Sequence, residues 1–193
     1  MRSKLTWIVA GLIVVALLFG CTPKNRMTRE EVIQQHASRI MPPMKPLCSY
    51  TNFKLANMEI TEEITDDEKK LKAAKDLEAK LNARLSPLLE SWRGQKTTPD
   101  AKGTLVITPK LQSLYIVSAG ARFWVGGMAG DSKIDMDLIL AEEETGNKIG
   151  AARIDRTASG MKGGWTVGAT DKALPDLIVD IAYQYLAQNY ASK

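Results

Sequence analysis

The sequence predicts an α+β fold, with a mainly antiparallel sheet and two long helices packed on one of its faces. Apolar residues recur every three or four positions in 66–88 and again in 171–190, which is typical of core-facing helices. Residues 133–141 alternate strictly between apolar and polar side chains, as half-buried strands do. The elements follow in the order strand, helix, strand, strand, strand, helix. This order favours helices gathered on one face of an antiparallel sheet.

The first expected strand covers residues 50–60, and a helix follows it. The acidic run 66–68 places negative charge at the helix N-terminus, where it complements the helix dipole. Pro87 is expected to end or kink this helix because proline lacks an amide donor. The stripe expected to face the core consists of Leu71, Ala74, Leu77, Leu81, Leu85 and Leu88.

Three further strands are expected in the middle of the chain. Residues 104–110 form one of them, and 111–117 continue extended; Pro109 suggests the end of the strand or an edge position. Residues 133–141 and 148–157, joined by a Glu-Thr-Gly-Asn turn, form the most clearly specified hairpin. The closing helix is expected to bury Leu174, Leu177, Ile178, Ile181, Ala182, Tyr185 and Leu186.

The N-terminus has the organisation of a secretory signal peptide. Arg2 and Lys4 precede an uncharged apolar run at 5–19, which closes on Gly20-Cys21. A cysteine directly after the cut resembles the bacterial lipoprotein lipobox, and the resemblance implies that Cys21 is acylated and becomes the new N-terminus. The alternative is an uncleaved transmembrane helix. Fifteen helical residues rise only about 22 Å, however, and the bilayer core needs about 30 Å.

The residue after this cysteine indicates which membrane holds the anchor. It is Thr22 and not aspartate, which favours the outer membrane in the enteric lipoproteins that the leader resembles. We therefore divide the chain into a signal peptide at 1–20, a lipidated tether with a Pro-rich spacer at 21–49, and a single α+β domain at 50–193. Within the tether, Thr28 and the glutamate three residues later have capping-box spacing and predict a short helix that the following prolines stop.

Charge and cysteine content exclude several classes of partner. The formal net charge is +4, and two of these charges leave with the signal peptide, so we expect no nucleic-acid partner. If Cys21 carries lipid, Cys48 is the only remaining thiol. Burial is its ordinary state, while a reactive or intermolecularly paired cysteine is the alternative. Cys48 and His36 lack the clustering of ligands that a zinc site needs, so no metal and no cofactor are expected.

No arrangement of residues indicates an enzyme. His36 is the one histidine and lies in the expected tether, away from any nucleophile that it could activate. Asp135 and Asp137 share a strand face and are close enough to hold a cation, but such alternating carboxylates usually form a solvated face. The acidic run 142–144 is interpreted as a solvated turn. The glycine-rich run 160–168 lacks the Gly-Lys-Ser/Thr of a phosphate-binding loop.

Two glycine-rich segments with aromatic side chains are the candidate partner contact. They cover 120–130 and 160–168 and flank the hairpin, so an antiparallel sheet would place them near the same end. Aromatic, methionine and arginine side chains are enriched at the cores of interfaces. In the alternative interpretation, the glycines bend neighbouring strands and the tryptophans cap the core. The candidate contact residues are Arg122, Phe123, Trp124, Met128 and Trp165.

The same residues carry a family resemblance. The run Gly-Thr-Leu-Val-Ile-Thr-Pro, the segment from Arg122 to Gly130, the alternating strand with its Glu-Thr-Gly-Asn-Lys turn, and Gly-Gly-Trp before the closing helix resemble domain of unknown function 4410. This bacterial lipoprotein family has no established activity, and the likeness covers roughly residues 50–190. The resemblance implies a cell-envelope lipoprotein with an α+β domain.

Together these observations predict a periplasm-facing lipoprotein that acts as a binding or assembly module. Its expected partners are the membrane, through lipidated Cys21, and either another envelope protein or further copies of itself. A carrier of a hydrophobic ligand is an alternative, and an envelope hydrolase is the least favoured one.

Overall fold

The computed structural model describes residues 27–95, 98–117, 131–158 and 169–190. The chain divides into two compact units, Met1–Val32 and Ile33–Lys193, and each is described by itself. In the first unit the predicted capping box is confirmed. The Glu31 amide donates to Thr28 Oγ1 at 3.2 Å, and the Thr28 amide donates to Glu31 Oε2 at 2.8 Å. This pair starts helix α2 (Arg29–Arg39).

The second unit contains a mixed sheet, which has five strands within the described residues. Its centre is formed by β3 (Thr104–Tyr115) and β4 (Ser132–Glu142), which run antiparallel, and β5 (Lys148–Ala158) lies antiparallel to β4 at one edge. On the other side, β1 (Asn52–Leu55) and β2 (Glu59–Ile60) both run parallel to β3. The α+β class and the mostly antiparallel sheet are thus confirmed, while the first expected strand is split in two.

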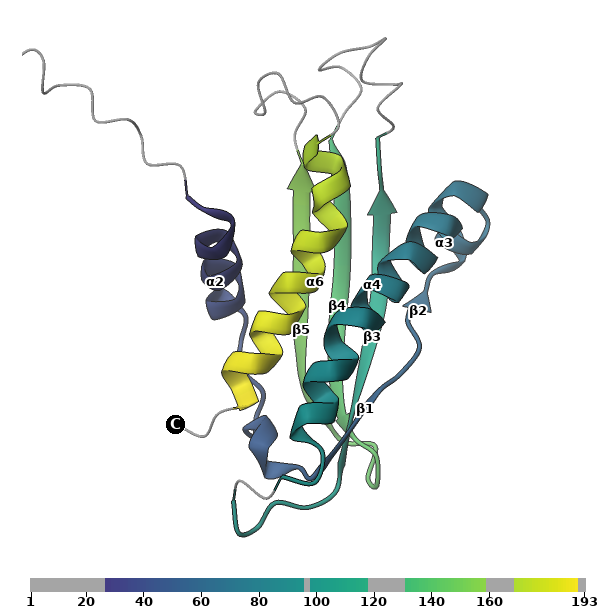
Figure 1. The fold of residues 1–193 in the computed structure, drawn as a ribbon. Coiled ribbons are helices and arrows are strands. Elements are labelled where there is room, and N and C mark those ends of the chain that lie inside the picture. Colours follow the sequence, from purple (N-terminus) through teal and green to yellow (C-terminus); the bar gives the residue numbers. More distant parts are fainter. Residues whose placement is uncertain (1–26, 96–97, 118–130, 159–168, 191–193) are drawn as a thin grey trace, which may run out of the picture. The chain divides into compact units, whose positions relative to one another are not determined.

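Helices α4 (Glu68–Trp92) and α6 (Ala169–Tyr190) cover one face of the sheet, as Figure 1 shows. The predicted order of elements is incomplete. It lacks the short helices η1 (Leu47–Ser49) and α3 (Glu62–Thr65), and α6 begins at Ala169, ahead of the start expected between Asp171 and Pro175. Along the described parts of the chain, we find no helix with the length and apolar character needed to span a bilayer.

Helix α4 runs through Pro87 to Trp92, so the proline does not end it. A proline inside a helix costs about 3 kcal/mol. The turn beyond it buries Leu89 and Trp92, and burial of a large apolar side chain contributes roughly 1.5–3 kcal/mol. Burial of this last turn therefore outweighs the lost hydrogen bond. At the other end, Asp67 caps the helix by accepting from two backbone amides at 2.9 and 3.0 Å.

Pro109 lies inside the central strand β3, so neither the strand end nor the edge position predicted for it is correct. The Ile107 carbonyl accepts a hydrogen bond from the Ala56 amide at 2.9 Å, so odd-numbered backbone groups here point toward β1 and β2. Ile107 is the last residue paired with β1, and Lys110 is the first paired with β2. The missing amide of Pro109 therefore faces the gap between these two short strands, where no hydrogen bond is lost.

The core lies between the two long helices and the sheet. Near the start of β1, the Phe53 ring meets Trp92 edge-on at 5.5 Å between centroids, and Trp92 stacks on Tyr190 at 4.1 Å. Other side chains that are at most 1% exposed include Ile64, Leu77, Leu81, Leu85, Leu105, Ile107, Leu111, Ile134, Met136 and Tyr185.

Residues 33–50 also pack against this core. Ala37, Leu47 and Cys48 are fully buried, and the Gln188 side-chain amide donates to the Ala37 carbonyl at 2.8 Å. The compact unit therefore begins ahead of the predicted domain boundary at residue 50. The burial predicted for Cys48 is confirmed.

Candidate interaction surface

The predicted contact residues lie outside the described residues, as does the acylation site. These residues are Arg122, Phe123, Trp124, Met128, Trp165 and Cys21. The strands that flank the two glycine-rich segments are described. Tyr115 is paired with Lys133, and Ser132 with Ala158, so the last residue of β3, the start of β4 and the end of β5 lie at one end of the sheet. We call this the exit end.

The exit end presents apolar side chains among its described residues. Tyr115 is 52% exposed and Ile116 is 39% exposed. The next residue turns inward: Val117 is buried, and its amide donates to the Oγ atom of fully buried Ser132 at 2.9 Å. This bond joins the segment after β3 to the first residue of β4. The sequence analysis missed Tyr115 and Ile116, although an apolar pair directly after a strand was the available signal.

Asp135 lies on the sheet face opposite the helices, with the same orientation as Asp137, as the alternation predicts. The expected solvated carboxylate is wrong for Asp135, which is 4% exposed. Arg153 on β5 binds it in a bidentate way, with Nε to Oδ1 at 3.2 Å and Nη2 to Oδ2 at 2.7 Å. The Asp135 carboxylate in turn raises the pKa of Arg153.

Asp137 has a different partner. Its Oδ2 accepts a hydrogen bond from the Gln112 side-chain amide on β3 at 2.8 Å. The two aspartates are thus each bound to a neighbouring strand instead of converging on a shared cation. Within the described ranges, the structure shows no group of three or more acidic, histidine or cysteine side chains that could hold a metal ion.

Glu142 organises the opposite end of the sheet, which we call the turn end. Its Oε1 accepts from Lys45 Nζ at 2.6 Å and from the Tyr50 hydroxyl at 3.0 Å, and its Oε2 accepts from Thr145 Oγ1 at 2.8 Å. These bonds join the end of β4 to the segment that precedes β1. The Glu142 side chain is only 15% exposed as a result.

This network suppresses acid–base chemistry near neutral pH. The bonds from Lys45, Thr145 and Tyr50 lower the pKa of Glu142 to about 2. Burial and the neighbouring carboxylate raise the pKa of Tyr50 well above its usual range. The carboxylate stays ionised and the phenol stays protonated, so neither group exchanges a proton at neutral pH.

The solvated turn expected at 142–144 is confirmed for Glu143 and Glu144, which are exposed in a turn, and is wrong for Glu142. Glu143 forms an ion pair with Lys54 on β1, and Glu144 accepts from the Thr104 amide at 2.9 Å. A surface pocket of about 530 Å³ lies between this turn and the residues before β1. Of the carboxylates on its wall, Glu142 and Glu144 are already engaged by protein donors, which favours a structural role for the turn end.

His36 on α2 is half-buried and interacts electrostatically with Arg156 and Asp155 of β5. Burial, followed by the nearby Arg156 guanidinium, lowers the pKa of His36. The Nε atom of Arg156 is buried without a hydrogen-bond partner within the described part of the chain. A neutral histidine beside a buried cation avoids repulsion between like charges, so this pair is consistent with packing.

Comparisons with known proteins add no family. No family model and no curated protein sequence matches the chain. Several solved structures resemble it weakly, and three of them illustrate the range. A PelC dodecamer from Paraburkholderia phytofirmans has a TM-score of 0.45 at 10% identity, covering 77% of this chain and 95% of that chain. A DUF330 protein from Xanthomonas campestris has a TM-score of 0.41 at 8% identity, covering 78% and 87%.

The third is a candidate lipoprotein from Caulobacter crescentus, with a TM-score of 0.36 at 12% identity, covering 84% of this chain and 96% of that chain. At these scores and identities the likenesses establish neither a family nor a function. The resemblance to domain of unknown function 4410 therefore stays a prediction.

Proposed function

We propose that the protein is a lipid-anchored binding or assembly module of the bacterial cell envelope. The leader carries this proposal: a basic start, an apolar run too short to span a bilayer, and Gly20-Cys21 at its end. Acylation of Cys21 would hold the module on a membrane facing the periplasm. Thr22 after the acylated cysteine favours the outer membrane.

The described domain supports binding over catalysis. Its polar side chains at the turn end bind one another, and Asp135 and Asp137 are held by Arg153 and Gln112. A general acid or base needs a pKa near the working pH and an open position beside the substrate. The ion pairs seen here supply neither.

The exit end is the proposed contact surface. Exposed Tyr115 and Ile116 precede the first predicted contact segment in the chain, and aromatic side chains are frequent anchors of binding energy. The partner is an envelope protein or a further copy of the chain. The proposal assigns Arg122, Phe123, Trp124, Met128 and Trp165 to this contact.

The anchor is tested by replacing Cys21 with alanine. We expect the precursor to lose its acyl mass and the protein to leave the membrane fraction. Intact mass spectrometry and membrane flotation measure the two effects. If the variant kept its acylated mass and floated normally with membranes, the lipoprotein proposal would be contradicted.

The contact surface is tested with a photo-crosslinking amino acid at Trp124 in living cells, with the same probe at exposed Asp100 near the turn end as a matched control. Capture of a distinct protein at Trp124 alone identifies an adaptor, and capture of a second copy identifies self-assembly. Equal capture at both positions, or none at Trp124, contradicts the assignment.

A further inference from the structure

Met41 and Met44 are the most exposed large apolar side chains in the described residues, at 80% and 77%. They flank two prolines, of which Pro42 is exposed and Pro43 is half-buried. Met44 is followed by Lys45. Such exposure is costly in water and points to a surface that is covered in the functional state.

The backbone of this segment is fixed although its methionine side chains are not covered. The Met41 carbonyl accepts from the Tyr185 hydroxyl of α6 at 3.2 Å. The Met44 amide donates to the Ile149 carbonyl of β5 at 2.9 Å. A side chain at Gly150 would lie 3.2 Å from Pro43, so the glycine permits the segment to lie this close to the strand.

A segment fixed in this way is preorganised. The backbone is already ordered, so contact with another surface costs little further conformational entropy. The prolines restrict it further, because each fixes its own φ angle. The two methionines are thus held outward on a rigid support.

Two exposed cations lie close to the segment. Arg39 precedes Met41 by two residues, and Lys148 precedes Ile149, whose carbonyl binds the Met44 amide. Lys45 is engaged by Glu142 and lines a pocket with Asp100 and Glu144, so it is not counted with these two cations. An apolar tip close to cations suits a bilayer surface with anionic head groups.

The chain is long enough for the proposed anchor and the Met41 segment to contact one bilayer surface. The chain from Cys21 to the start of α2 contains seven residues, which extend to about 23 Å at roughly 3.3 Å each. Helix α2 has 11 residues and is therefore about 16 Å long. The linker is longer than the helix, so chain length alone does not prevent the acylated end and Met41 from contacting the same membrane.

We propose that Met41 and Met44 form a membrane-contact site, which inserts into the head-group region of an anionic bilayer beside the lipid anchor. This inference rests on the proposed lipoprotein function. It adds a second contact with the membrane, which would fix the orientation of the domain on the surface.

The experiment uses the full acylated protein in vesicles of phosphatidylethanolamine and phosphatidylglycerol. Spin labels are attached to Met41→Cys, Met44→Cys and, as the control, Lys72→Cys, an exposed position on α4 outside both proposed contact surfaces. Cys48 is fully buried and Cys21 is blocked by the lipid, so only the introduced cysteine reacts. Collisions with a water-soluble nickel complex and with oxygen report whether each label lies in water or in lipid.

We expect labels at positions 41 and 44 to lose nickel collisions and gain oxygen collisions on vesicles, while the label at position 72 stays in water. Replacing Arg39 and Lys148 with glutamine should weaken this protection. An acylated, membrane-bound protein whose labels at 41 and 44 stay in water, or are protected no more than the label at 72, would overturn the inference alone. A protein without acyl mass that does not float would overturn the proposed function as well.

Discussion

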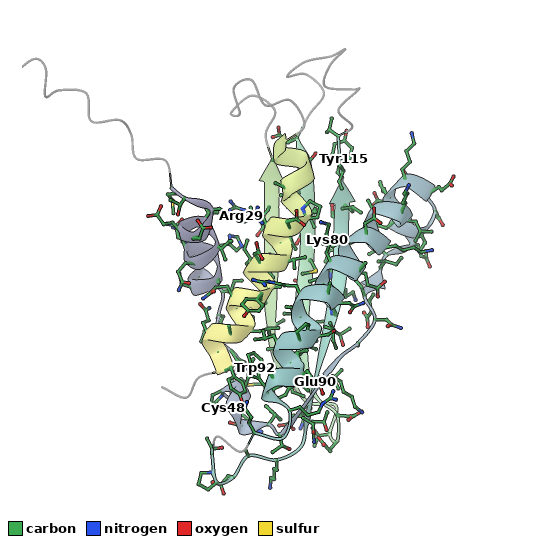
Figure 2. The ribbon with its side chains drawn as sticks, viewed as in Figure 1. Arg29, Cys48, Lys80, Glu90, Trp92 and Tyr115 are labelled. Atoms are coloured by element: carbon green, nitrogen blue, oxygen red, sulfur yellow. The ribbon has the colours of Figure 1, made fainter. Side chains whose placement is uncertain are left out.

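The two ends of the sheet use their side chains in opposite ways. At the turn end, Glu142, Glu143 and Glu144 each bind a donor from another segment, and the aromatic rings of Phe53 and Trp92 close the core. At the exit end, Tyr115 and Ile116 extend into solvent. Figure 2 shows Trp92 and Cys48 near one end of the domain and Tyr115 at the other.

This difference indicates that the turn end stabilises the fold, whereas the exit end is available for binding. Groups that satisfy one another hold the fold together and have little capacity left for a partner. Exposed apolar groups contribute little to the fold and retain their full capacity for contact. Changes at the turn end should therefore lower stability, whereas changes at the exit end should lower binding.

The largest expected effect is that of Trp92→Ala at the turn end. The ring is 7% exposed and contacts both Phe53 and Tyr190, so its loss leaves a cavity and should lower the free energy of unfolding by about 3–5 kcal/mol. Urea denaturation measures this. Tyr115→Ala is the matched control and should change the free energy by no more than about 0.5 kcal/mol. Similar losses for both variants would remove the contrast between the ends.

A smaller, pH-dependent effect is expected for Glu142→Gln. The folded protein lowers the pKa of Glu142 from 4.5 to about 2, so the carboxylate stabilises the fold fully above pH 4.5. This contribution declines as the pH falls from 4.5 toward 2. The variant should thus be less stable than the parent at pH 7, and the difference should narrow in acid.

The midpoints of urea unfolding at pH 7 and at pH 3 measure the Glu142→Gln effect. Glu143→Gln is the matched control, because that carboxylate forms one ion pair and its side chain is 41% exposed. A Glu142→Gln deficit that stays constant across this pH range would show that the network does not depend on the carboxylate charge.

The smallest expected effects come from two glycines at the turn end. Gly103 has φ +79° and Gly146 has φ +69°, so alanine at either position should cost roughly 1–2 kcal/mol. At Gly103 the added Cβ would also lie 3.2 Å from Glu144 Oε2, whereas nothing lies within 4 Å at Gly146. Gly103→Ala should therefore be the more destabilising variant in thermal unfolding, and the reverse order would argue against a fixed Glu144.

The parts of this fold that could be predicted are those determined by the pattern of neighbouring residues in the sequence. The alternation at 133–141, the capping box at Thr28 and the acidic cap of α4 each follow from neighbouring residues, and the structure confirms all three. The spacing of apolar residues likewise predicts helix α4.

The errors arise where distant segments decide the outcome. Pro109 is tolerated because the flanking strand is broken opposite it, and the burial of Asp135 depends on Arg153 in the next strand. The engagement of Glu142 depends on Lys45, far away along the chain. A short stretch of sequence specifies neither the pairing register of the strands nor ion pairs between residues far apart in the chain. The candidate contact residues 122–128 and Trp165 stay a prediction.

The hydrogen bonds of the segment at Met41 have a consequence for the timing of folding. Its partners, Tyr185 and Ile149, are made more than one hundred residues later in the chain. Strands β3, β4 and β5 are neighbours in sequence and can pair early, because local contacts close short loops. The Met41 segment can therefore dock only after the C-terminal helix has been made. If the chain is exported as we propose, a chain halted before α6 would have its N-terminal portion exposed to proteases.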